Sequence, residues 1–277
     1  MDERYSVLMS VYQKEKPAYL QAALHSMLEQ TWPPDEIVLV CDGPLTEALD
    51  QVIEGYLPQL VVVRLPENRG LGHALAEGLK HCKNELIARM DTDDLSVRER
   101  CAWQIAYLRE HPEVDVLSGT LAEFKGDHLD VEAAKEHILS YKKVPAADQD
   151  IRSYIRYRNP VNHPCVMFKK TSVLAVGGYQ PCHLFEDYDL WARMYLAHYT
   201  FANLTETLLY MRVDEMHKRR GGLRYGGAVL SFQTKLYRYG VIGLPQYLAA
   251  TSARILVSLL PDKVRKIVYS MSLRTIR

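Results

Sequence analysis

The segment Leu86–Asp94 constrains the fold of this chain more than any other part of the sequence. An apolar run of strand length is followed at once by three carboxylates, Asp91, Asp93 and Asp94, as expected where a buried parallel strand emerges at its carboxyl end. In an open α/β sheet the ligand crevice lies outside these ends, so Asp91 and Asp93 can point the same way and share a divalent cation. Carboxylate oxygens favour Mg²⁺ or Mn²⁺, and such an ion commonly enters an enzyme bound to a phosphate. The alternative is a solvated turn in which Asp94 caps a helix that begins near Val97.

Strand-like and helix-like segments alternate through the first third of the chain. Strands are expected at 5–11, 36–41, 60–64 and 86–90, and helices at 17–28, 46–56 and 71–82. This alternation predicts a mainly parallel, right-handed α/β sheet with helices on both faces. Further segments are a helix at 97–110, strands at 114–118 and 207–213, and a loop at 159–168 leading into a strand. The polar stretch up to Ala147 is expected to be exposed.

A second predicted strand also ends in an acid. Strand 36–41 runs directly into Asp42-Gly43-Pro44. Because the carboxyl ends of neighbouring parallel strands meet at one crevice, Asp42 is expected near Asp91 and Asp93. An ionised carboxylate only accepts hydrogen bonds, which suits contact with a nucleobase or ribose. The alternative is a type I turn, for which Asp-Gly-Pro is equally suitable.

Three more acids precede an apolar helical pattern. Glu186, Asp187 and Asp189 stand at the start of a helix that continues through Leu190 and Trp191. The helix dipole favours acids in this position by ~0.3 to 1 kcal/mol each, which accounts for one or two of them. A carboxylate that faces a cleft among like charges has a raised pKa, as suits a general base near neutral pH.

A basic turn follows the strand expected at 207–213. His217, Lys218, Arg219 and Arg220 are followed by two glycines, a combination that resembles a cradle for a diphosphate. In this interpretation Arg219 and Arg220 grip phosphate oxygens, and His217 is a further metal ligand or phosphate contact. The alternative is a solvated basic turn.

The composition limits the class of protein. With 277 residues and 48% hydrophobic content, the chain can form one large or two small domains. Lys plus Arg and Asp plus Glu are equal at 34 each, which argues against a nucleic-acid-binding protein. Five cysteines without a Cys-x-x-Cys pair, and no secretory signal ahead of Tyr5, favour a reduced, cytoplasmic location. No apolar run reaches the ~18 to 20 residues that a membrane span needs.

The chain is expected to end in a helical extension at 223–277, after a catalytic domain at 1–222. Six basic residues and one acid lie between Arg254 and Arg277, a net charge of six minus one, or +5. Apolar residues interleaved with cations predict a helix lying on an anionic surface, here the inner face of the cell membrane. The alternative is packing on the catalytic domain or on a second subunit.

Taken together, these segments resemble the family 2 glycosyltransferases, which are inverting enzymes of the GT-A (nucleotide-diphospho-sugar transferase) fold. The likeness is greatest to the bacterial capsule, exopolysaccharide and O-antigen branch, and it covers roughly Tyr5 to Gly222. Its most specific parts are Ala-Arg-Met-Asp-Thr-Asp-Asp at 88–94 and Phe-Glu-Asp-Tyr-Asp-Leu-Trp at 185–191. The other parts are the segments 6–12, 40–43, 67–75, 163–164 and 177–179.

The resemblance implies roles for individual residues. Asp42 would contact the base of a nucleotide-sugar, Asp91 and Asp93 would be the acids of the Asp-x-Asp motif with Asp93 nearest the metal, and Asp187 would be the catalytic base beside Glu186. Further candidates for donor binding are Ser10, Tyr12, Arg69, Arg219 and Arg220, and those for acceptor binding or site lining are His163, Asp189 and Trp191. The implied ligands are Mg²⁺ or Mn²⁺, a UDP-sugar donor, and a glycan or polyprenyl-diphosphate-linked saccharide acceptor.

Two departures from the family pattern, and two other classes of protein, bear on the function. Cys41 stands where the family commonly has the first acid of Asp-Asp-Gly-Ser, and the Gln-x-x-Arg-Trp of processive members is absent, which favours a single sugar transfer. A sugar nucleotidyltransferase would need a glycine-rich loop after the first strand, but Tyr12–Pro17 contains no glycine. The other alternative is a non-catalytic subunit that binds a nucleotide-sugar or glycan.

Overall fold

A computed structural model describes residues 3–213, 221–261, 264–265 and 275–276 of the chain. The first part alternates strands and helices as the sequence predicts. Its elements are β1 (Tyr5–Val11), α1 (Pro17–Leu28), β2 (Glu36–Cys41), α2 (Glu47–Gly55), β3 (Leu60–Arg64), α3 (Leu71–His81) and β4 (Leu86–Asp91).

The middle of the chain is more irregular. Its elements are β5 (Leu95–Ser96), α4 (Arg100–Glu110), β6 (Val116–Phe124), α5 (Val131–Lys135), β7 (Ile138–Lys142), α6 (Asp148–Tyr154), the 3₁₀ turn η1 (His163–Cys165), β8 (Met167–Lys169) and α7 (Lys170–Ala175). The last part holds α8 (Glu186–Leu196), β9 (Phe201–Arg212), α10 (Gly222–Arg238), α11 (Leu244–Leu259) and β10 (Thr275–Ile276).

One mixed sheet joins these strands in the order β10-β7-β6-β8-β4-β1-β2-β3, and β9 pairs with β6 and β5. The predicted α/β fold is confirmed, but parallel order is confined to β4-β1-β2-β3 and to the pair β6–β9. The pairs β4–β8, β8–β6, β6–β7, β7–β10 and β5–β9 are antiparallel. The second half therefore departs from the mainly parallel prediction, because β7, β8 and β10 run antiparallel to the strands beside them.

The register brings the ends of three parallel strands level. Ser10 of β1 pairs with Val40 of β2 on one side and with Asp91 of β4 on the other. Asp42, two residues after Val40, therefore lies at the same edge of the sheet as Asp91. This alignment is what the predicted convergence of the strand-end acids requires.

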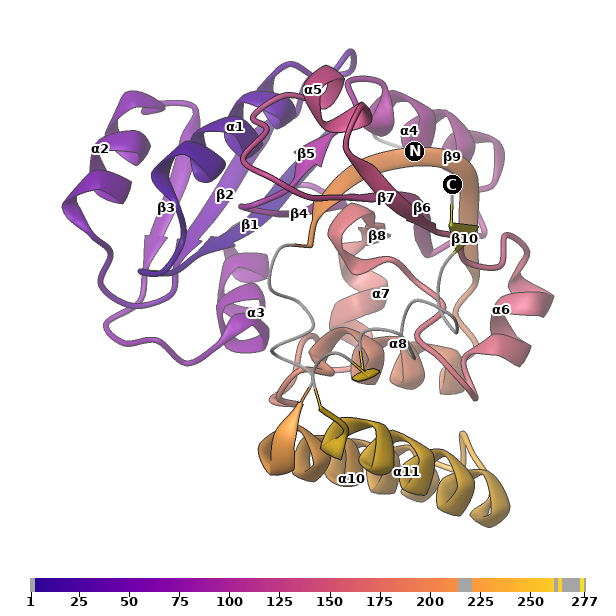
Figure 1. Ribbon diagram of the computed structural model, residues 1–277. Coiled ribbons are helices and arrows are strands. Elements are labelled where there is room, and N and C mark those ends of the chain that lie inside the picture. Colours follow the sequence, from indigo (N-terminus) through magenta and orange to yellow (C-terminus); the bar gives the residue numbers. More distant parts are fainter. Residues whose placement is uncertain (1–2, 214–220, 262–263, 266–274, 277) are drawn as a thin grey trace.

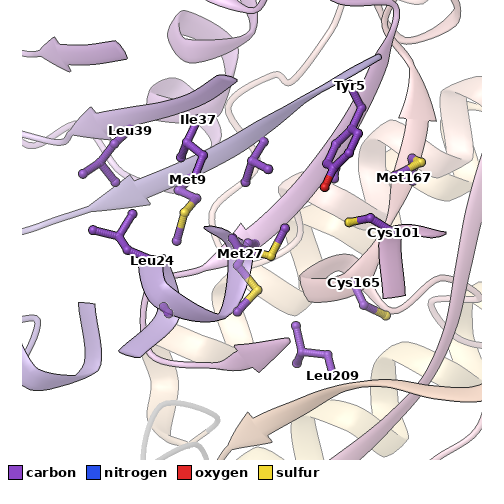
Figure 2. Close-up of a cluster of buried hydrophobic side chains, with 14 of the residues drawn as sticks. Tyr5, Met9, Leu24, Met27, Ile37, Leu39, Cys101, Cys165, Met167 and Leu209 are labelled. Carbon is purple, nitrogen blue, oxygen red and sulfur yellow. The ribbon is translucent and has the colours of Figure 1, made fainter. Parts of the chain in front are cut away.

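Helices cover both faces of the sheet (Figure 1). Alternate residues of β1 point to opposite faces: Met9 packs with α1, α2 and α4 in one cluster, and Leu8 packs with α3 and α8 in another. Figure 2 shows part of the first cluster, which includes Cys101 and Cys165 together with Met27 and Met167. Four of the five cysteines are buried and all are free thiols.

Strand β6 extends beyond the predicted 114–118, and all nine of its residues are buried. The prediction was too short because polar residues interrupt the apolar pattern of the strand. Each polar side chain finds a partner inside the protein. Ser118 donates to the Asn162 carbonyl at 2.9 Å, and Ser140 of β7 donates to the Glu123 carboxylate at 2.5 Å. The start of the stretch expected to be exposed is therefore a buried part of β6, whereas nearly all residues from 125 to 147 are exposed or half-buried, as predicted.

The C-terminal helices α10 and α11 lie side by side beneath α8 (Figure 1). Phe232 of α10 stacks on Phe185, just before α8, with ring centroids 4.6 Å apart and an interplanar angle of 2°. Lys235 of α10 forms an ion pair with Asp189 of α8 at 2.7 Å. Among the described residues, no helix is long and apolar enough to cross a membrane.

Candidate functional site

A cleft of about 1120 Å³ lies at the carboxyl ends of β1, β2 and β4. Its walls are formed by the ends of these strands, the start of α3, the segment before α8 and the end of β9. The predicted site residues that line it are Ser10, Tyr12, Asp42, Arg69, Asp91, Asp93 and Glu186. Residues that are more than 170 positions apart in the sequence thus share one cleft, although their individual roles stay predictions.

Three carboxylates form the floor of the cleft. One oxygen from each of Asp91, Asp93 and Asp94 lies within 4.8 Å of the others. Asp94 is only 1% exposed, and its pKa is raised well above the ordinary value by burial and by the charges of Asp93 and Asp91. A divalent cation would offset this repulsion, and an all-oxygen donor set fits Mg²⁺ or Mn²⁺.

Asp94 does not cap a helix, as one alternative had it, because α4 begins only at Arg100 with Glu99 at its N-cap. Its Oδ1 accepts a hydrogen bond from the backbone N–H of Arg212 at 2.9 Å. Its Oδ2 is buried and has no hydrogen-bond partner among the described residues. A buried, unpartnered carboxylate oxygen is costly unless a cation or proton meets it, so Asp94 is a third candidate metal ligand beside Asp91 and Asp93.

Asp42 is 4% exposed and holds the turn before α3. Its Oδ1 accepts from the backbone N–H of Arg69 at 2.9 Å, and its Oδ2 accepts from that of Gly70 at 3.0 Å. The next residue, Gly43, has φ of +87°, and a Cβ there would lie 2.7 Å from the Asn68 backbone nitrogen, so only glycine fits. Asp42 therefore shapes the cleft wall, and its predicted contact with a nucleobase stays a prediction.

The acid pair at the start of α8 stands beside the start of α3. Glu186 lines the cleft, and its Cβ would lie 3.1 Å from a Cβ at Gly72, so the glycine permits the close approach of the two helices. Burial, together with the charge of Asp187, raises the pKa of Glu186 to about 7. A carboxyl group with this pKa is partly protonated at neutral pH.

Asp187 does not border the cleft as the described residues define it. Its Oδ2 accepts from the Asn159 side-chain amide at 2.6 Å, and its Oδ1 accepts from the Tyr188 backbone N–H at 2.7 Å. Burial raises the pKa of Asp187 above its ordinary value. The two bonds fix the orientation of this carboxylate next to Glu186.

The three residues expected to contact the acceptor or line the site lie elsewhere. Trp191 is fully buried in the core because it lies on the apolar face of α8. Asp189 is also fully buried, and it forms ion pairs with Arg193 at 3.0 Å and Lys235 at 2.7 Å. His163 is 6% exposed, with its Nε2 2.9 Å from the Tyr179 hydroxyl, and burial lowers its pKa well below 6.5. All three side chains are therefore buried inside the fold rather than in the wall of the cleft.

The predicted donor or metal contacts His217, Arg219 and Arg220 fall outside the described residues. A neighbouring cation, Arg212, was not singled out from the sequence but lines the cleft. Its Nε donates to the Asp93 carbonyl at 3.1 Å, and its guanidinium lies 3.8 Å from the centre of the Tyr19 ring. The signal that could have identified Arg212 is a charged residue at the end of a predicted strand, which is also what indicated Asp42.

A second residue that the sequence did not indicate is Arg89, which lies beneath the acids. Its side chain is 1% exposed, it forms an ion pair with Asp91, and its Nε and Nη1 have no hydrogen-bond partner among the described residues. A buried cation at this position partly neutralises the surrounding carboxylates.

The chain is similar to known proteins along most of its length. The sequence model described as "Glycosyl transferase family 2" matches residues 6–170, which is more than half of the chain. The amylovoran biosynthesis glycosyltransferase AmsE of Erwinia amylovora is 40% identical over 272 residues, covering 96% of this chain and 97% of that protein. The UDP-Gal:alpha-D-GlcNAc-diphosphoundecaprenol beta-1,3-galactosyltransferase of Escherichia coli is 34% identical over 274 residues, covering 98% and 97%.

A solved structure shares the fold. The mannosyltransferase PcManGT from Pyrobaculum calidifontis, in complex with GDP-Man and Mn²⁺, superposes with a TM-score of 0.62 at 18% identity, covering 97% of this chain and 79% of that one. At this identity the likeness concerns the fold alone.

Proposed function

The chain belongs to glycosyl transferase family 2, and on that premise we propose that it transfers one sugar from a nucleotide-sugar to a hydroxyl group of a lipid-linked glycan, with inversion at the anomeric carbon. We place this reaction in the biosynthesis of a bacterial surface polysaccharide. The two relatives support this setting, because one is named for amylovoran biosynthesis and the other for transfer to a GlcNAc-diphosphoundecaprenol.

The observation that carries the proposal is the cluster of three carboxylates in the cleft, in which the buried Oδ2 of Asp94 has no hydrogen-bond partner among the described residues. Asp91, Asp93 and Asp94 would hold Mg²⁺ or Mn²⁺, and the bound ion would supply positive charge that stabilises the diphosphate leaving group. Mn²⁺ is also present in the complex of the P. calidifontis mannosyltransferase. UDP is the nucleotide expected here, as in the name of the E. coli relative.

The donor would lie across the strand ends. Ser10, Tyr12 and Arg69 line the cleft together with Asp42, which supports assigning them to the nucleotide half of the donor. Arg212 has its guanidinium held against the Asp93 carbonyl and the Tyr19 ring, which keeps a fixed positive charge next to the acids. That charge favours an anionic ligand in this part of the cleft.

The acid pair on α8 would remove the proton from the acceptor hydroxyl. We assign the base to Asp187, whose orientation is fixed by Asn159 and by the Tyr188 N–H. Glu186, with a pKa of about 7, carries less than a full negative charge near neutral pH, so the two carboxylates repel each other less. General-base assistance of this kind contributes typically ~10²- to 10⁴-fold to the rate.

The test is a screen of nucleotide-sugars with Mn²⁺, with and without EDTA, in which release of the nucleoside diphosphate is measured. We expect slow hydrolysis of at least one UDP-sugar, which EDTA abolishes and Mn²⁺ restores. A GlcNAc-diphosphate-lipid offered as acceptor should accelerate release and gain one hexose by mass spectrometry. Binding of a UDP-sugar without hydrolysis or transfer would show a non-catalytic binding protein instead.

A further inference from the structure

Helix α11 exposes four leucines. Leu244, Leu248, Leu256 and Leu259 are 51%, 55%, 66% and 53% exposed. At about 100° per residue, these four positions fall on one side of the helix. The buried positions of α11 are instead the polar residues Thr251 and Ser258. An amphipathic helix in water buries its leucines and exposes its hydroxyls, so this helix is suited to an apolar environment outside the fold.

Helix α10 adds a second exposed apolar stripe. Leu223, Leu230 and Tyr237, seven positions apart, are 83%, 45% and 41% exposed. Other positions of the helix bury Val229, Phe232 and Leu236 inside the protein. Tyr237 stacks on Tyr247 of α11 with ring centroids 5.3 Å apart, which joins the stripe to the second helix. We call the exposed leucines of α11 together with this stripe the outer face.

The charges around the outer face are all of one sign. Between Gly221 and Pro261 the sequence contains no Asp or Glu and four Lys or Arg residues. Of these four, Lys235 faces Asp189 and Arg254 donates to the Tyr157 carbonyl at 2.6 Å. Arg224 and Arg238 are exposed, and each directly follows a member of the α10 stripe. A second copy of this chain would bring cations against cations, whereas an anionic lipid surface offers both acyl chains and phosphates.

We propose that the outer face lies on the surface of an anionic lipid membrane, with the leucines of α11 among the acyl chains and Arg224 and Arg238 at the phosphates. The described helices are too short or too polar to span a bilayer, which fits a helix pair that lies along its surface. Because Phe232 and Lys235 tie α10 to α8, the membrane also fixes the orientation of the acid pair that begins α8. Lipid binding itself does not depend on the proposed sugar transfer.

The test is flotation of the full-length protein with vesicles of phosphatidylglycerol and phosphatidylethanolamine, compared with vesicles of phosphatidylcholine alone. We expect the protein to float with the anionic vesicles and not with the neutral ones, and a rise to 1 M salt to reduce binding because salt screens the charges. The double variant Leu248→Glu/Leu256→Glu should lower the partition coefficient at least about 10-fold, since each inserted leucine contributes about that factor.

The matched control is Leu139→Glu/Leu174→Glu, which makes the same charge change at positions 50% and 47% exposed outside the outer face. It should float like the wild type. Both double variants should keep the wild-type melting temperature and Mn²⁺-dependent hydrolysis of a soluble UDP-sugar. The proposal is overturned if the wild type does not float with the anionic vesicles, or if Leu248→Glu/Leu256→Glu floats as the wild type does. It is also overturned if the wild type sediments as a dimer and Leu248→Glu/Leu256→Glu sediments as a monomer, because a second copy of the chain then covers the outer face.

Discussion

The backbone N–H of Arg212 donates to the carboxylate of Asp94 across 118 positions of sequence, at a distance of 2.9 Å. This bond places the end of β9 against the loop that follows β4. It uses only one oxygen of Asp94 and leaves the other buried without a partner among the described residues. The site therefore contains an acceptor that the fold itself does not satisfy.

Asp94→Asn should weaken Mn²⁺ binding about 10- to 100-fold while the protein stays folded. The substitution preserves the oxygen that accepts from Arg212 but replaces the unpartnered oxygen by an amide, which cannot ligate a cation through its N–H₂ group. Isothermal titration calorimetry with Mn²⁺ measures the effect. Asp150→Asn makes the same charge change in the exposed first turn of α6 and should bind Mn²⁺ normally. Unchanged affinity in Asp94→Asn would remove this residue from the ligand set.

Asp187→Asn should lower kcat about 10²- to 10⁴-fold and leave donor binding nearly unchanged, because the amide cannot accept the acceptor's proton. Glu186→Gln should reduce kcat by much less. Steady-state kinetics with both substrates, together with calorimetric titration of UDP, separate the two steps. If the Gln variant were inactive and the Asn variant active, the base would be Glu186.

The contribution of Glu186 to the stability of the protein should fall as pH rises from about 4.5 to 7. The folded-state pKa of Glu186, about 7, lies above its ordinary value of 4.5, so the folded protein binds more protons than the unfolded chain within this window. The Glu186 contribution to the free energy of unfolding should drop there by about 1 to 3 kcal/mol. Urea unfolding of the wild type and Glu186→Gln at pH 4.5 and pH 8 tests this, since the free energy of unfolding of the wild type relative to that of the variant should be lower at pH 8 than at pH 4.5. The same difference between the two proteins at both pH values would contradict the assignment.

Asp42→Ala should destabilise the protein by about 1 to 3 kcal/mol, because the N–H groups of Arg69 and Gly70 both lose their acceptor. Asp42→Asn keeps one acceptor oxygen and should cost less. Thermal unfolding gives the order of stability, and the KM for the nucleotide-sugar should rise in the same order because the turn lines the cleft. A large rise in KM in Asp42→Asn without loss of stability would instead favour a direct contact with the base.

Lys235→Met should lower the free energy of unfolding by about 2 kcal/mol. Asp189 is fully buried, and without Lys235 its charge is balanced by Arg193 alone. Chemical denaturation measures the loss. Arg238→Met, which removes an exposed cation from the same helix, is the control and should change stability by less than about 0.5 kcal/mol. Equal effects would mean that the ion pair with Asp189 does not stabilise the packing of α10 on α8.

Local patterns predicted the elements whose partners are near in sequence. The run before Asp91 and the alternation of strands and helices up to it were sufficient to predict four parallel strands and acids at a shared edge. Strand β6 was underestimated because Ser118 and Glu123 are satisfied by Asn162 and Ser140, and such distant partners leave no periodic signal. A hydrophobic pattern reports which residues avoid water, but it does not identify what covers them.

The same limit applies to the candidate site. Asp42, Asp91 and Asp93 could be brought together from strand-end patterns, because the topology of an α/β sheet determines where those ends meet. The acid pair Glu186 and Asp187 was assigned to the site by the family resemblance, and of the two only Glu186 lines the cleft. Asp189 matched the acid pattern equally well, yet it faces α10, and that packing depends on contacts between residues 50 positions apart such as Tyr239 and Asp189. The orphaned oxygen of Asp94 was likewise beyond the reach of sequence, because it depends on which partners the folded chain supplies.

The buried carboxylate of Asp189 limits which C-terminal helices can be exchanged between related enzymes. A graft that replaced α10 and α11 with helices of another protein would leave the buried Asp189 carboxylate paired with Arg193 but without its second cation, unless the donor helix carried a cation in register with Lys235. Chimaeras joined at Gly222 should therefore be chosen by this one pairing before any similarity of their outer surfaces.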